Sequence, residues 1–137
     1  MKPSILKALL LLLIFGSVGS SCLKEDIDID LTAKTWKVEK IRKSGQLTFT
    51  NTDSTYILRF VSNEEYNLSL DVNTCMGNYE ILQKGSVEIQ TMACTEICCD
   101  FEFAEDLSLL LPKMTRYYAR GGELYFEGDG KIVLRSY

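Results

Sequence analysis

The sequence contains no histidine, and it has a single Trp, two Pro and no uninterrupted apolar run of the roughly 20 residues that a membrane span needs. Without histidine, the chain has no imidazole to act as general base, proton shuttle or metal ligand. The longest apolar run, residues 8–15, is too short to span a bilayer stably. We therefore expect neither histidine-dependent catalysis nor a stable transmembrane helix.

The sequence also has fewer basic than acidic residues. The chain carries 15 Lys and Arg against 19 Asp and Glu, and loss of residues 1–21 with Lys2 and Lys7 would change the net charge from -4 to -6. Such a surface repels polyanions, so nucleic acid is not an expected partner. The 46% hydrophobic and 25% charged residues are ordinary for one globular domain.

The first 21 residues have the pattern of a secretory signal peptide. Lys2 and Lys7 form a basic start, residues 8–15 are apolar, and small residues follow as far as Ser21. The junction 18–22 resembles a lipobox, in which the thiol after the cleavage site receives diacylglycerol. We expect cleavage after Ser21 and a lipid anchor on Cys22. The alternative is a plain signal peptide cut near Ser20, with Cys22 an ordinary thiol.

The residues after Cys22 bear on the destination of the chain. Lys24, Glu25 and Asp26 resemble the lysine-plus-two-acids export signal of Bacteroidetes lipoproteins, which implies display on the outside of the bacterial outer membrane. The alternative is a charged, solvated tether with no signal in it. The expected organisation is a signal peptide at 1–21, a lipid-anchored acidic tether at 22–34 and one β domain at 35–137.

Residues 35–137 show short alternating segments separated by turn residues, which is typical of antiparallel strands. The breaks contain residues that adopt turn conformations at little cost, as at 51–54, 84–85, 121–122 and 128–130. The expected strands are residues 35–43, 46–50, 56–62, 66–72, 75–82, 86–92, 116–120, 124–127 and 131–136.

One segment has helical spacing instead. Phe103, Leu107, Leu110 and Leu111 recur on one helix face, Asp100 precedes them as an N-cap, and Pro112 ends the run. We therefore predict a mainly β (α+β) fold: a small, strongly curved antiparallel sheet or partial barrel of about eight to nine strands packed against one short α-helix.

The order of these features resembles the META domain family, which includes the HslJ heat-shock lipoproteins. The resemblance covers nearly all of the chain after the tether. It is carried by Trp36, residues 56–60 (YILRF), 73–79 (NTCMGNY), 91–94 (TMAC), the helix at 103–111, residues 122–126 (GELYF) and the closing strand. The family usually places its cysteine four residues before the glycine, whereas Cys75 lies only two residues before Gly77.

The resemblance implies a curved antiparallel sheet with one helix, no established enzymatic activity, and a loose link to stress tolerance. It also implies a disulfide between Cys75 and Cys94. A lipocalin-like domain is the rival, because residues 35–38 (TWKV) at the start of a barrel also suit that family. Cys75 and residues 91–94 favour the META domain.

The cysteines by themselves leave the pairing open. Cys75, Cys94, Cys98 and Cys99 are an even set in an oxidising compartment and allow three complete pairings. Adjacent Cα atoms lie about 3.8 Å apart, below the usual range of about 4.4 to 6.8 Å, so we expect no bond between Cys98 and Cys99. Crossed pairings of Cys75 with Cys98 or Cys99 remain as alternatives.

Other candidate sites have simpler interpretations. The four thiols lack the C-x-x-C spacing of zinc knuckles and of redox motifs, so we expect no metal and no other cofactor. The acids Glu102, Glu105 and Asp106 suit the start of a helix, and Glu64 and Glu65 suit a turn. The aromatic side chains of the last strands suit a core as well as a ligand surface, namely Tyr117, Tyr118, Tyr125 and Phe126.

Three functions fit the sequence. The first is a non-enzymatic, lipid-anchored envelope protein that binds a protein or another envelope component, with stress protection as its role. The second is a lipocalin-like carrier that encloses a small apolar ligand. The third is a protease inhibitor that presents a disulfide-stiffened loop at 93–100. A filled interior with an exposed stiff loop would favour the first or third.

Overall fold

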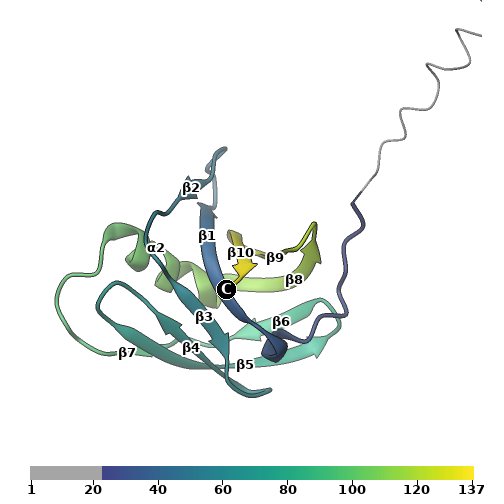
Figure 1. The fold of residues 1–137 in the computed structure, drawn as a ribbon, viewed down its shortest axis with the longest axis horizontal. Coiled ribbons are helices and arrows are strands. Elements are labelled where there is room, and N and C mark those ends of the chain that lie inside the picture. The colour runs from purple at the N-terminus through teal and green to yellow at the C-terminus, as the bar shows by residue number, and fades with distance from the viewer. Residues whose placement is uncertain (1–22) are drawn as a thin grey trace, which may run out of the picture.

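The structure is a computed structural model that describes residues 23–137. Cys22 and the expected signal peptide lie outside the described residues. Within them the chain forms a closed, strongly curved antiparallel β-barrel with one helix at its side (Figure 1). The predicted fold class is confirmed, and the barrel is closed rather than partial.

The elements are η1 (Leu31–Ala33), β1 (Thr35–Lys43), β2 (Thr50–Asn51), β3 (Ile57–Phe60), β4 (Glu65–Ser69), β5 (Thr74–Gln83), β6 (Ser86–Ile89), β7 (Ala93–Cys94), α2 (Glu102–Leu110), η2 (Leu111–Lys113), β8 (Met114–Arg120), β9 (Glu123–Gly128) and β10 (Gly130–Ser136).

The barrel is a series of hairpins closed by its two ends. Its strands follow the order β10-β9-β8-β6-β5-β4-β3-β1, and β1 then pairs with β10 from Trp36 opposite Ser136 to Lys43 opposite Gly130. β2 pairs with β1, and β7 pairs with β5. The junction of β6 with β8 is much shorter, with Ser86 opposite Arg116 as its one register pair. The barrel wall is thus continuous but thinly paired at this junction.

Alternation along the strands directs the large apolar side chains inward. In β8 and β9, Tyr117 and Phe126 belong to the core cluster, whereas Tyr118 and Tyr125 stack against each other outside it. Gly77 allows a close approach, because a Cβ there would lie 2.6 Å from the Tyr66 hydroxyl oxygen. Aromatic rings fill much of the interior, including Trp36, Tyr56, Phe60, Tyr66, Tyr79, Tyr117 and Phe126.

The helix packs through the expected stripe. Leu107, Leu110 and Leu111 are buried, and Phe103 stacks on Tyr56 with ring centroids 5.2 Å apart. The N-cap prediction was wrong, because Phe101 occupies that position and Asp100 bonds to another part of the chain.

The predicted strand at 46–50 is not formed over most of its length, since only Thr50 of it belongs to a strand, β2. Gln46 N donates to Lys43 O, and Gln46 Oε1 accepts from Lys43 N, so the chain turns directly after β1. Gly45 supplies the positive φ of 78° that this turn uses. The alternation at 46–50 therefore reflects a turn rather than a strand, and Leu47 is exposed at it.

Candidate functional site

The loop between β7 and α2 is fastened to the turn between β4 and β5 by the side chain of Asn73. Its Oδ1 accepts from Thr95 Oγ1 and Ile97 N, each at 2.8 Å. Its Nδ2 donates to Ile97 O at 2.7 Å and to Asp100 Oδ2 at 2.6 Å. Asn73 is buried, and these four bonds use the full capacity of its amide.

Two carboxylates complete this fastening. Asp100 Oδ1 accepts from Val72 N at 2.9 Å, and Asp71 accepts from Phe101 N at 3.0 Å and from the Tyr56 hydroxyl. Burial of Asp100 favours its neutral form, but the hydrogen bonds from Val72 N and Asn73 outweigh burial and hold its pKa below the ordinary value. The ionised form of Asp100 therefore stabilises the loop.

The cysteines form two disulfides in the same region. Cys75 and Cys94 lie opposite each other on β5 and β7 and are bonded, with Sγ atoms 1.99 Å apart. This is the pairing that the META resemblance implies. The structure has neither crossed pairing, and these four sulfurs are held in disulfides rather than as metal ligands.

Cys98 and Cys99 are bonded to each other, contrary to expectation. The expectation used only the Cα separation, which is indeed short at 3.7 Å. Cys99 adopts a φ of 93°, a conformation that non-glycine residues rarely take, and this backbone turn accompanies the bond. The two cysteines are exposed at the tip of the loop.

The fastened segments carry exposed apolar side chains. Val72, Ile97 and Phe101 have 46%, 58% and 67% of their surface exposed, although their backbones take part in the hydrogen bonds described above. We call residues 71–73 together with 95–101 the loop end. The loop end is a preorganised backbone that presents apolar side chains to solvent, which suits recognition.

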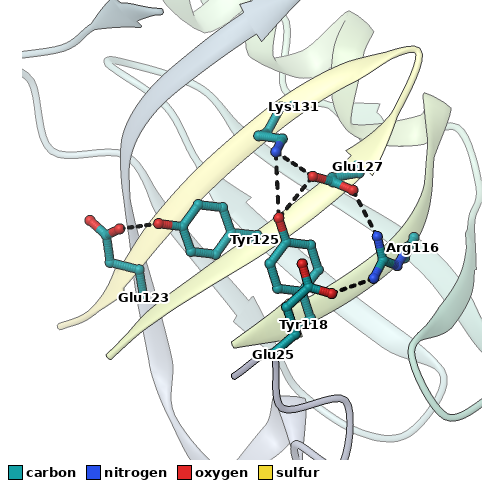
Figure 2. A network of polar contacts seen from close by, with 7 residues as sticks. All are labelled: Glu25, Arg116, Tyr118, Glu123, Tyr125, Glu127 and Lys131. Atoms are coloured by element: carbon teal, nitrogen blue, oxygen red, sulfur yellow. Dashed lines mark hydrogen bonds and ion pairs between the residues drawn. The ribbon is translucent and has the colours of Figure 1, made fainter. Parts of the chain in front are cut away.

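A second cluster lies on the outer face of β8, β9 and β10 (Figure 2). Tyr118 and Tyr125 stack with centroids 5.1 Å apart, and the Tyr118 hydroxyl donates to Glu127 at 2.8 Å. Glu127 also bonds Arg116 and Lys131. Burial and Glu127 raise the pKa of Tyr118, whereas hydrogen bonds from Lys131 and Tyr118 outweigh burial and lower the pKa of Glu127. Because the charges of Arg116, Glu127 and Lys131 pair with one another, we interpret the cluster as stabilising the outer face of these strands.

The segment before β1 lies along the edge of β8 that faces β6 and reaches the β5–β6 turn. Asp26 pairs with Ala119 of β8 through two backbone hydrogen bonds of 2.8 and 2.7 Å. Glu25 pairs with Arg116 at 2.5 Å, and Asp28 pairs with Lys84 at 2.7 Å. We call residues 23–34 the tether segment, which is thus docked on the barrel rather than extended away from it. Lys24, Glu25 and Asp26, the candidate export signal, lie at the start of the docked part.

The sequence matches a known domain. The family model of the META domain covers residues 29–136. The chain belongs to the META domain family. The predicted resemblance is therefore confirmed. No curated protein matches the sequence significantly.

One solved structure has a similar fold. It is an NMR structure of a protein from Burkholderia xenovorans, with a TM-score of 0.61 and 14% identity over 78% of this chain and 83% of that one. At this identity the likeness concerns the fold alone. It supports the META domain as a small, mainly β fold.

Some of the remaining acidic candidates form an ion pair or turn hydrogen bonds, whereas Glu102 and Glu105 are exposed on α2. Asp106 pairs with Lys43 at 2.7 Å, and Glu64 and Glu65 follow Ser62, whose hydroxyl accepts from both of their backbone N–H groups. Within residues 23–137, no cluster of three Cys, Asp or Glu side chains is placed to hold a metal ion. In the same range no helix is long and apolar enough to cross a membrane.

Sequence reasoning found the cysteines of the loop end but missed what holds the loop. The sequence marks Asn73 only as part of the family-like segment 73–79, and the position of Asp100 predicts a helix N-cap. The two are 27 residues apart, and nothing in local spacing connects them. A sign was nevertheless present, because Asn and Asp beside a turn commonly bond backbone N–H groups.

Proposed function

We propose that this chain is a non-enzymatic, lipid-anchored lipoprotein of the bacterial outer membrane whose META domain binds a protein or another envelope component. The binding role is carried by one observation, the exposed apolar side chains of the fastened loop end. Such a surface loses little conformational entropy on binding, because its backbone is already held. Stress protection is the role that we expect this binding to serve.

The arrangement of the tether segment supports display of the loop end. β5 begins at Thr74, which donates to Thr95 of the loop end, and it ends beside Lys84, which bonds Asp28 of the tether segment. Ten strand residues span about 33 Å, so these two parts of the domain lie at opposite ends of β5 (Figure 1). A lipid on Cys22 would thus hold the domain with its loop end away from the attachment point.

The packed interior argues for binding at the surface. Large side chains from both sides of the barrel meet inside it, including Tyr66, Leu68 and Phe126, each with 2% or less of its surface exposed. A lipocalin-like carrier needs an enclosed space for its ligand. The filled barrel therefore favours recognition at the loop end over a carrier role.

A protease inhibitor is the second candidate, because a stiff exposed loop is what an inhibitor presents to an enzyme. The vicinal disulfide and the Asn73 hydrogen bonds supply that stiffness. Dose-dependent inhibition of a purified serine or cysteine protease, lost in Ile97→Ser, would favour this candidate over a non-inhibitory binding role.

Mass spectrometry of the mature protein tests the anchor. We expect an N-terminal peptide that begins with an acylated Cys22, and a Cys22→Ser variant that is released from the membrane fraction. A mature chain that begins upstream of Cys22 and carries no lipid would refute the anchoring proposal.

Photo-crosslinking on intact cells tests the binding role. A photoreactive residue at position 97 should give a defined protein product, whereas the same residue at position 47 should not. Leu47 is the matched control because it is apolar and 94% exposed but lies on the turn after β1. Adducts with lipid alone at position 97 would contradict a protein partner.

A further inference from the structure

The charges of the mature chain are separated along the sequence. Residues 60–112 contain ten Asp and Glu and one basic residue, Lys84, whereas residues 22–59 and 113–137 together contain nine acids and twelve Lys and Arg. The first segment therefore has a net charge of -9 and the rest a net charge of +3, although the composition as a whole is only moderately acidic.

The fold converts this division into two parts of the barrel wall. β4, β5 and β6 are neighbours in the sheet, β7 pairs with β5, and α2 follows β7, so the acidic residues share one contiguous part (Figure 1). The remaining wall, formed by β8, β9, β10 and β1, holds the excess of positive charge. The domain thus has a strongly acidic part and a weakly basic part.

The apolar side chains of the loop end lie in the acidic part. Glu96 precedes Ile97 and Glu102 follows Phe101, and both acids are exposed. No Lys or Arg occurs between Lys84 and Lys113. Apolar side chains are therefore presented beside carboxylates. Lys43 of β1 lies near α2, where it pairs with Asp106 at 2.7 Å and is also attracted by Glu102. Within residues 23–137, however, neither Glu96 nor Glu102 forms an ion pair of its own.

We propose, building on the proposed binding function, that the loop end docks a cationic peptide segment of a partner protein. Apolar side chains of that segment contact Val72, Ile97 and Phe101, and its Lys or Arg side chains face Glu96 and Glu102. Charge complementarity selects this partner, because anionic lipid surfaces and acidic proteins are repelled by the same carboxylates. A second copy would place this acidic surface against itself.

Titration of the purified mature protein with synthetic peptides tests the proposal. A short peptide of Lys and Leu residues should bind, and its affinity should fall as salt is raised. A peptide with Glu in place of Lys should bind more weakly by tenfold or more, and so should one with Ser in place of Leu. Equal binding of the Lys and Glu peptides would overturn the proposal.

Paired charge variants separate a local effect from net charge. The double variant Glu96→Gln/Glu102→Gln and the control Asp53→Asn/Asp129→Asn each remove two exposed carboxylates. We expect roughly three- to tenfold weaker binding of the Lys-Leu peptide to the first variant, from two exposed ion pairs. The control should retain binding within about twofold. Equal losses would show only general attraction and would overturn the proposal.

Apolar variants locate the site. Phe101→Ser should weaken peptide binding by about fivefold or more, as expected for an anchoring aromatic residue. Leu47→Ser is the control, because Leu47 is the most exposed large apolar residue outside the loop end. Circular dichroism and thermal melts should show that both variants remain folded, since both side chains are exposed. A larger effect at Leu47 than at Phe101 would refute the assignment.

Other occupants give distinguishable results. Binding to phosphatidylcholine vesicles, or dimerisation in sedimentation, that is lost in Phe101→Ser would assign the loop end to lipid or to a second copy and overturn the proposal. If position 97 crosslinks a partner on cells through a segment without Lys or Arg, the binding function survives and the cationic-peptide proposal fails. If position 97 crosslinks neither a protein nor another envelope component, the binding function itself fails.

Discussion

Asn73 Nδ2 donates a hydrogen bond of 2.6 Å to Asp100 Oδ2, which joins the β4–β5 turn to the segment before α2. The same amide also bonds Thr95 and Ile97, so one side chain fixes three points of the loop. A single residue with only 8% of its surface exposed thus makes four of the hydrogen bonds that hold the loop end.

Replacement of Asn73 by Ala should destabilise the protein by about 2 kcal/mol or more, because it leaves buried partners without hydrogen bonds. Urea unfolding of the mature protein measures this difference. Asn63→Ala is the control, since Asn63 is exposed in the turn before β4, and its effect should stay within about 0.5 kcal/mol. Similar midpoints for the two variants would refute the role given to Asn73.

Acidification should loosen the loop end. The folded state lowers the pKa of Asp100, so its carboxylate stabilises the fold above the unfolded value of about 3.9, and this contribution is lost as pH falls through the folded-state pKa. Asp100→Asn should therefore be less stable than wild type at neutral pH, and the gap should narrow below about pH 4. Unfolding at several pH values measures the gap, with Asp53→Asn as control. A gap that does not change with pH would contradict this account.

Mild reduction should open the Cys98–Cys99 bond before the Cys75–Cys94 bond. Both Cys98 and Cys99 are exposed, and Cys99 has a strained backbone, whereas the other bond joins the exposed Cys94 to the fully buried Cys75. Timed alkylation with peptide mass spectrometry measures the order. Loss of the Cys75–Cys94 bond should lower the free energy of unfolding by roughly 3 kcal/mol. The double variant Cys75→Ala/Cys94→Ala measures this loss, once the cost of the cavity left at Cys75 is subtracted. Labelling of Cys75 before Cys98 would reverse the assignment.

Removal of residues 23–28 of the tether segment should lower stability although the META domain match begins only at residue 29. A chain that begins at Ile29 loses both backbone bonds between Asp26 and Ala119 and the ion pairs of Glu25 and Asp28. We expect a loss of about 1 to 3 kcal/mol from two hydrogen bonds and two exposed ion pairs. Thermal melts of the two chains, with a Glu25→Gln variant as the intermediate case, test this. Identical melting temperatures would show that the segment does not stay docked in solution.

The strands were the part of the fold most open to prediction. β1 spans Thr35–Lys43, as expected. The bounds of α2 (Glu102–Leu110) lie one residue earlier at each end than those of the expected helix at 103–111. Hairpins place their signals close together in sequence, since alternation marks the strands and glycine marks the turns, as at Gly85 and Gly121. Local pattern was therefore enough for these elements.

The failures concern side chains whose partners are distant in sequence. Asp100 has the residue type and position of an N-cap, but it bonds Val72 and Asn73 instead. β7 has only two residues and exists through its pairing with β5, and the docking of Asp26 on Ala119 joins positions 93 apart. No periodic pattern in the sequence connects the partners in these contacts, so only the folded structure reveals them.

The short junction between β6 and β8 has a mechanical consequence for an anchored protein. If Cys22 is fixed in a membrane and the loop end holds a partner, tension between them reaches the barrel through Glu25 and Asp26, which bond Arg116 and Ala119 of β8. β8 borders the junction where Ser86 and Arg116 form the one register pair, so the load arrives beside the least paired boundary of the wall. Under force, the described part of the chain would open there first, with β1 and β10 still joined.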